Sequence, residues 1–209
     1  MNATWRVDPQ RTALLVIDMQ NDFVRAGYPM EVPMARRRIP RMREVVGECR
    51  AAGIPVVYTR HVLLDTFDVS PLESAYNPRL LTAGMRAGSF GAEVVDELRP
   101  EIGDVVVEKH RYDAFHNTRL ETVLATVCGL RRVDTVVVIG TLTEVCCDST
   151  ARAAYMRDFN VVFVGDATGA LSEEAQAATE KNISTFFGRV LTTGELVAEI
   201  RESREGQSK

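Results

Sequence analysis

Short runs of apolar, often β-branched residues alternate along the chain with longer stretches in which apolar residues recur at helical spacing. Most of the short runs are apolar at every position, which is typical of strands that helices cover on both faces. Strands that alternate with amphipathic helices indicate repeated βαβ units. We therefore expect an α/β fold, a three-layer α-β-α sandwich around a mostly parallel six-stranded sheet. The expected strands are Ala13–Asp18, Ile54–Tyr58, Asp104–Lys109, Thr135–Ile139, Asn160–Val164 and Arg189–Leu191.

Helix signals occupy the intervals between these runs. Thr118 with Glu121, and Thr192 with Glu195, have the spacing of a capping box, in which each residue caps the backbone of the other. Each pair is expected to begin a helix. The expected helices are about Met34–Ala52, Ala92–Leu98, Thr118–Gly129, Glu144–Arg157, Ser172–Phe186 and a last helix after Thr192.

Residues 60–91 form the least regular part of the chain, with two prolines and three glycines between Pro71 and Gly91. An irregular segment of this length in a compact domain is more often functional than idle. It could serve as a lid or as a subunit contact. We expect residues 1–209 to form a single domain that carries this segment.

Composition narrows the possible functions. The 209 residues are 45% apolar and carry a net charge of −4, which gives no electrostatic footprint for nucleic acid or an anionic membrane. No apolar run has the roughly 18 residues that a membrane span requires, and the first residues lack the apolar core of a signal peptide. The four cysteines form no disulfide-rich pattern. A cytoplasmic protein without nucleic-acid or membrane partners is expected.

Three polar residues stand where apolar strands end. Asp18 closes one run, Lys109 closes another, and Cys146 follows a third by a short turn. In an open parallel sheet, ligands bind outside the carboxyl ends of the strands, so the three side chains are expected at one edge. An acid, a cation and a thiol together are the parts of a cysteine-based hydrolase.

Cys146 has the most informative position of the three. If Thr143 is the N-cap of the following helix, Cys146 is its third residue. Free backbone N–H groups and the positive end of the helix dipole there favour thiolate and could hold an oxyanion. The alternatives are an inert buried cysteine, a loop-capping role for Asp18 and a snorkelling Lys109. The neighbouring Cys147 is expected in the core.

Other chemistries have weaker support in the sequence. The three histidines have no His-x-x-x-His or Cys/His ligand spacing, and the settings of His61 and His116 suggest no role. If Lys109 faces the site, His110 points to the opposite side of the strand. Phosphate-binding glycine loops are missing, which argues against dinucleotide and P-loop functions. We expect no metal and no cofactor.

These residues resemble the isochorismatase-like cysteine hydrolase superfamily over about residues 11–196. The specific segments are residues 13–23 (ALLVIDMQNDF), the strand that ends at Lys109, and residues 140–152 (GTLTEVCCDSTAR). The resemblance implies a catalytic triad of Asp18, Lys109 and Cys146. It also implies a cis peptide bond between Thr141 and Leu142, and an oxyanion hole made by the N–H groups of Leu142 and Cys146.

The resemblance also narrows the activity. True isochorismatases typically lack the cysteine, and the Asp-x-His metal pattern of nicotinamidases is absent after Tyr58. The chain therefore looks most like the N-carbamoylsarcosine, ureidoacrylate and biuret hydrolase group. We expect hydrolysis of a C–N bond in a small amide or ureido compound through a thioester. The alternatives are vinyl-ether hydrolysis of the isochorismatase type and a catalytically inactive interaction protein of the same fold.

The substrate pocket and the assembly follow less directly. Phe23, Tyr112 and Phe115 are expected to shape the pocket. Arg60 could bind a substrate carboxylate or form a surface salt bridge. Relatives commonly form dimers or tetramers, so a homo-oligomer is expected.

Overall fold

A single six-stranded sheet forms the centre of the computed structural model, which describes residues 5–207. All strand pairs are parallel, and the spatial order is β3-β2-β1-β4-β5-β6. This confirms the expected α/β class. The strands are β1 (Thr12–Ile17), β2 (Val56–His61), β3 (Val105–Lys109), β4 (Thr135–Thr141), β5 (Asn160–Gly169) and β6 (Arg189–Leu191).

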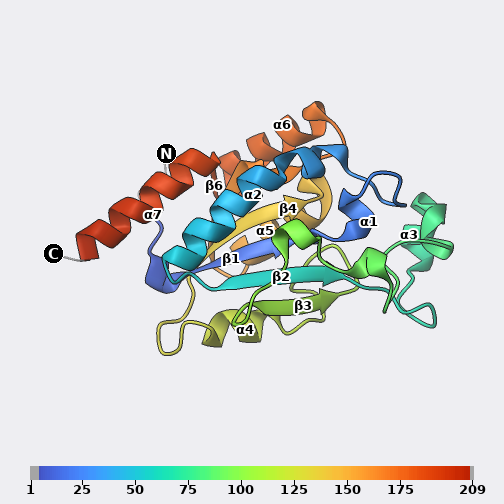
Figure 1. Cartoon of the computed structure of the whole chain (residues 1–209), viewed down its shortest axis with the longest axis horizontal. Coiled ribbons are helices and arrows are strands. Elements are labelled where there is room, and N and C mark those ends of the chain that lie inside the picture. The colour runs from blue at the N-terminus through green and yellow to red at the C-terminus, as the bar shows by residue number, and fades with distance from the viewer. Residues whose placement is uncertain (1–4, 208–209) are drawn as a thin grey trace.

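Helices cover both faces of the sheet and make three layers (Figure 1). Helices α2 and α7 pack on one face, and α4 and α5 pack on the other. The helices are α1 (Asn21–Val24), α2 (Pro33–Ala51), α3 (Pro71–Tyr76), α4 (Leu120–Thr126), α5 (Asp148–Tyr155), α6 (Glu173–Asn182) and α7 (Thr193–Gln207).

The strand sequences explain the two-sided core. Successive side chains of a strand point to opposite faces, so β1 sends Leu14 and Val16 into the core beneath α2 and α7. Three of its other residues, Ala13, Leu15 and Ile17, enter the core beneath α4 and α5. A strand buried on both faces is expected to be apolar nearly throughout, and β1 shows this pattern after Thr12.

One of the two expected capping boxes forms. The Thr192 N–H donates to Glu195 Oε2 over 2.8 Å, and the Glu195 N–H donates to Thr192 Oγ1 over 3.3 Å. The prediction at Thr118 was wrong, because its hydroxyl accepts from the Leu120 N–H instead and Arg119 takes the cap position.

The expected helix over Ala92–Leu98 was also wrong. The segment has two short 3₁₀ turns, Phe90–Ala92 and Asp96–Leu98. Between them the Val95 N–H donates to the Met19 carbonyl over 2.9 Å. Pairing with the loop after β1 therefore replaces the intrahelical bonds.

Gly140 brings the ends of β1 and β4 together. Its φ is +121°, and a Cβ atom added there would lie 2.1 Å from the Ile17 carbonyl oxygen. Only glycine tolerates both the backbone conformation and this approach. The contact fixes the residue after β1 beside the turn after β4.

No helix within residues 5–207 combines the length and apolar character needed to cross a lipid bilayer.

We predict that Gly140→Ala lowers the free energy of unfolding by about 1–3 kcal/mol from backbone strain alone, and by more if the β1 backbone cannot move. Chemical denaturation monitored by circular dichroism measures this change. Gly47→Ala is the matched control, because Gly47 lies within α2 and a Cβ atom added there would meet nothing within 4 Å beyond the adjacent backbone of its own helix. In this control the free energy of unfolding should rise by about 0.5–1 kcal/mol, because alanine replaces a glycine within a helix. Equal stabilities for the two variants would contradict the role of Gly140.

Candidate active site

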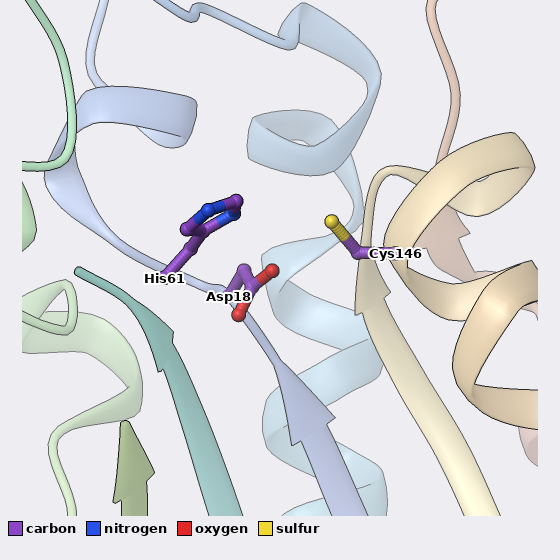
Figure 2. Close-up of side chains that lie close together, drawn as sticks. All are labelled: Asp18, His61 and Cys146. Carbon is purple, nitrogen blue, oxygen red and sulfur yellow. The ribbon is translucent and has the colours of Figure 1, made fainter. Parts of the chain in front are cut away.

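The carboxyl ends of four neighbouring strands carry the polar residues of the site. Asp18 follows β1, His61 ends β2, Lys109 ends β3, and Cys146 lies in the turn after β4. The strand register pairs His61 directly with Lys109. Figure 2 shows the side chains of Asp18, His61 and Cys146 converging on one space. The structure thus brings together the three residues of the expected triad and adds a histidine.

A buried ion pair lies at the centre of this group. Lys109 Nζ is 2.7 Å from Asp18 Oδ2, and both side chains are completely buried. The Thr59 hydroxyl donates to Asp18 Oδ1 over 2.6 Å, and Lys109 Nζ also donates to the Arg111 carbonyl over 2.9 Å. Buried charges are tolerated when they are paired and hydrogen-bonded in this way.

The backbone at Asp18 helps to aim its carboxylate. Its φ is +48°, in the left-handed region that aspartate tolerates better than most residues. The Asp18 N–H donates to the Thr59 hydroxyl over 3.1 Å. Together with the bond from the same hydroxyl to the carboxylate, this holds Asp18 to β2.

The turn that carries Cys146 is a π-helical turn over Thr143–Cys147. The expected N-cap was wrong, because Leu142 takes that position and the Thr143 hydroxyl donates to Gln176 Oε1 over 2.8 Å. Cys146 is therefore the fourth residue of the turn. The Thr141–Leu142 peptide bond is cis. Cys147 is buried in the core, as expected.

The protonation state of Cys146 differs from the sequence-based expectation. The pKa of its thiol is raised to about 12: burial raises it most, the Lys109 charge lowers it, and the Asp18 carboxylate raises it. Burial alone would lower the pKa of Lys109, but Asp18 and Cys146 outweigh burial and raise it. The resting site therefore holds a thiol beside an ammonium–carboxylate pair, because the loss of solvation outweighs the favourable dipole at the helix start.

His61 is the site residue that the sequence analysis missed. The available signal was the length of β2, which was expected to end at Tyr58 and continues to His61. The charged Arg60 argues against a strand at this position. Successive side chains of a strand point to opposite faces, however, so Arg60 lies on the face of the sheet opposite to His61. A strand extended to His61 would have placed the imidazole at the same edge as Lys109.

The same cluster contains possible metal ligands. Among the described residues, Asp18, His61 and Cys146 each offer one ligand atom, and these atoms lie within 4.8 Å of one another. Carboxylate, imidazole and thiolate are all zinc ligands. The Lys109 ammonium already pairs with Asp18 here, so a divalent cation would have to bind beside a like charge.

Tyr112, one of the residues expected to bind substrate, lies beside this cluster. Its ring centroid is 6.4 Å from that of His61, in an edge-to-face arrangement. The carboxylate of Glu73, on α3, lies close enough to raise the pKa of the Tyr112 hydroxyl, after the larger effect of burial. Tyr112 and Glu73 thus stand beside the group of buried catalytic candidates.

The other three residues pair or pack with other groups, although Phe115 packs in the same part of the core as Cys146. Arg60 pairs with Glu93 over 2.8 Å and also with Glu108; the salt-bridge alternative is therefore the one that the structure contains. Phe23 is packed in the core beneath α2, and Phe115 is packed in the core beneath α4 and α5. A contact of these residues with substrate stays a prediction.

The irregular segment 60–91 is partly ordered by α3 and a 3₁₀ turn over Pro78–Leu81. Phe67, Leu72, Tyr76 and Leu81 expose most of their side chains to solvent. Exposed apolar residues gathered in one segment are typical of a surface that contacts another chain. Whether the segment acts as a lid or as a subunit contact stays a prediction.

Comparison with known proteins gives consistent matches over nearly the whole chain. The family model of the isochorismatase domain matches residues 12–195. The chain is 33% identical over 186 residues to nicotinamidase 3 of Arabidopsis thaliana, covering 88% of this chain and 86% of that protein. It is 32% identical over 201 residues to the ureidoacrylate amidohydrolase RutB of Pantoea ananatis, covering 87% and 79%.

A solved structure is also similar. A cysteine hydrolase from Pseudomonas syringae pv. phaseolicola superposes with a TM-score of 0.89 at 29% identity, over 97% of this chain and 100% of that chain. The architecture described above is therefore shared with an experimentally determined fold.

We predict that Asp18→Asn lowers the pKa of the Cys146 thiol. The substitution removes a carboxylate that raises this pKa and leaves Lys109 free to pair with the thiolate. Alkylation of Cys146 by iodoacetamide near neutral pH should become faster than in the wild type, while circular dichroism reports whether the fold is retained. Mass spectrometry assigns the label, with Cys146→Ala as the control for the other thiols. Slower or unchanged alkylation would contradict the assigned electrostatics.

Proposed function

Because the chain belongs to the isochorismatase domain family, we propose that it is a cysteine hydrolase that cleaves a C–N bond in a small amide or ureido compound. The observation that carries this proposal is the Cys146 thiol, buried against the Asp18–Lys109 ion pair. The names of the two curated relatives, a nicotinamidase and a ureidoacrylate amidohydrolase, support the class of reaction.

In the proposed acylation step, Asp18 accepts the thiol proton as Cys146 attacks the substrate carbonyl carbon. A base is required because the thiol, with a pKa of about 12, is protonated at neutral pH. The Lys109 ammonium stabilises the developing negative charge on sulfur. The C–S bond forms, the C–N bond breaks, and the proton held by Asp18 passes to the leaving nitrogen.

Stabilisation of the oxyanion and hydrolysis of the thioester are the remaining parts of the proposed cycle. The N–H groups of Leu142 and Cys146 would stabilise the oxyanion, an effect worth roughly 3–4 kcal/mol per donor in comparable sites. Water activated by Asp18 then attacks the thioester carbon, and the C–S bond breaks to release the acid and restore the thiol. No cofactor takes part in these steps.

A ureido or N-carbamoyl substrate is favoured over nicotinamide. Although the chain is 33% identical to nicotinamidase 3, it lacks the Asp-x-His metal pattern after Tyr58 that the family resemblance attributes to nicotinamidases. We also propose that the protein assembles as a homo-oligomer, supported by the exposed apolar side chains of the segment 60–91.

Ammonia release across a panel of compounds tests the proposed reaction. We expect turnover of one or more members of a set that includes ureidoacrylate, N-carbamoyl amino acids and simple primary amides. Pyruvate release from isochorismate, without ammonia release from the panel, would favour vinyl-ether hydrolysis. Absence of turnover with every compound would favour an inactive interaction protein.

With the best compound, we predict that Cys146→Ala lowers kcat at least about a thousandfold, because no other group forms the thioester. Its melting temperature should stay close to that of the wild type. Cys128→Ala is the matched control, since Cys128 is only half-buried and lies outside the cluster. Full turnover by Cys146→Ala would refute the assigned nucleophile.

We predict that chelators leave the activity unchanged, because every proposed step uses protein side chains and backbone N–H groups. The measurement is ammonia release after dialysis against EDTA, with and without added Zn²⁺. Loss of activity on dialysis, restored by zinc, would instead assign Asp18, His61 and Cys146 as metal ligands.

A further inference from the structure

His61 presents a buried polar atom that the proposed mechanism does not use. The residue is 3% exposed, and its Nε2 atom has no hydrogen-bond partner within the described part of the chain. Buried polar atoms are nearly always paired. An unpaired one at the centre of a candidate site therefore indicates a missing ligand.

Neighbouring residues hold both the backbone and the ring of His61. The backbone N–H of His61 donates to Gln20 Oε1 over 2.7 Å, and the backbone carbonyl of His61 accepts from Gln20 Nε2 over 2.9 Å. These two bonds hold the end of β2. Tyr112 packs edge-to-face against the ring. The ring lies beside the side chains of Asp18 and Cys146 (Figure 2).

The chemical state of the ring makes Nε2 an acceptor. Burial lowers the pKa of His61 well below its usual value, and the charges of Lys109 and Arg111 lower it further. The ring also forms a hydrogen bond with the His110 backbone. Because Nε2 is the unpartnered nitrogen, this bond belongs to Nδ1, which carries the proton of the neutral imidazole. Nε2 is left with a free lone pair.

The neighbouring groups do not satisfy this lone pair. The Lys109 ammonium is directed to Asp18 and to the Arg111 carbonyl. Asp18 and Cys146 each have an atom within 4.8 Å of the His61 ligand atom. A substrate bond held against Cys146 therefore lies within reach of the His61 ring.

We propose that His61 Nε2 accepts a hydrogen bond from the N–H of the scissile amide or ureido nitrogen and thereby selects substrates that carry hydrogen on that nitrogen. The inference rests on the proposed C–N hydrolysis. With one N–H held by His61, the nitrogen lone pair turns toward Asp18, which delivers the thiol-derived proton as the C–N bond breaks. His61 is then a substrate-binding residue that also determines specificity.

The test compares two substrates that differ at one position. The best primary amide or carbamoyl compound from the panel is paired with its methyl ester or methyl carbamate, in which oxygen replaces the N–H-bearing nitrogen. His61→Leu removes the acceptor at similar volume, and His61→Gln keeps an acceptor near the position of Nε2. A dialysis step against EDTA precedes all assays, so that metal binding does not enter the comparison.

We expect His61→Leu to lower the amide-to-ester ratio of kcat/KM by roughly tenfold or more, because the buried N–H of the amide loses its partner while the ester has none to lose. His61→Gln should keep the ratio within about threefold of the wild type, since it retains the acceptor. If His61→Leu does not fold, the shorter His61→Asn should show the same amide-selective loss.

Equal losses on the amide and the ester would overturn the inference and assign His61 a purely structural role. No loss on either substrate in His61→Leu would overturn it as well. If the wild type hydrolyses neither substrate nor any other member of the panel, the proposed function itself fails and the inference fails with it. If the amide is hydrolysed but His61→Leu does not change the preference for the amide over the ester, the inference fails and the proposed function stands.

Discussion

The ion pair between Asp18 and Lys109 is the interaction on which the rest of the site depends. Neither charge could remain in the solvent-free centre of the molecule without the other, and removing one partner from such a pair typically costs several kcal/mol. The pair fixes the ends of β1 and β3, which are separated in the sheet by β2. It also sets the electrostatic environment of Cys146, which receives opposing influences from the two charges.

The sheet supplies the precision that this pair requires. Parallel strands bring their carboxyl ends to one edge, and the register sets His61 beside Lys109. Gly140 allows the backbones of β1 and β4 to approach so closely that a side chain would not fit. Because these constraints come from buried backbone and packed apolar strands, the polar groups are held by a rigid framework rather than by flexible loops.

The balance of charges leaves the side chains of the resting site in forms of low reactivity. Burial keeps the Cys146 thiol and the His61 imidazole neutral, so the net charge of the cluster is close to that of the Asp18–Lys109 pair alone. A buried nucleophile in its neutral form is protected from unspecific chemistry. In the proposed mechanism, activation depends on proton transfer from the thiol to Asp18, and the acceptor proposed at His61 Nε2 adds discrimination at the leaving nitrogen.

The sequence by itself determined the α/β class, the order of the strands along the chain and the positions of Asp18, Lys109 and Cys146, because apolar runs and their polar ends are local features. Only the tertiary structure decided what depends on neighbours that are distant in sequence. It extended β2 to His61 beside Lys109 and gave Thr143 a partner in Gln176. In place of a helix over residues 92–98 it formed 3₁₀ turns at Phe90–Ala92 and Asp96–Leu98, with Val95 between them bonded to the loop after β1. It also reversed the expected ionisation of Cys146, since the loss of solvation around a side chain follows from packing and cannot be read from its position in a helix.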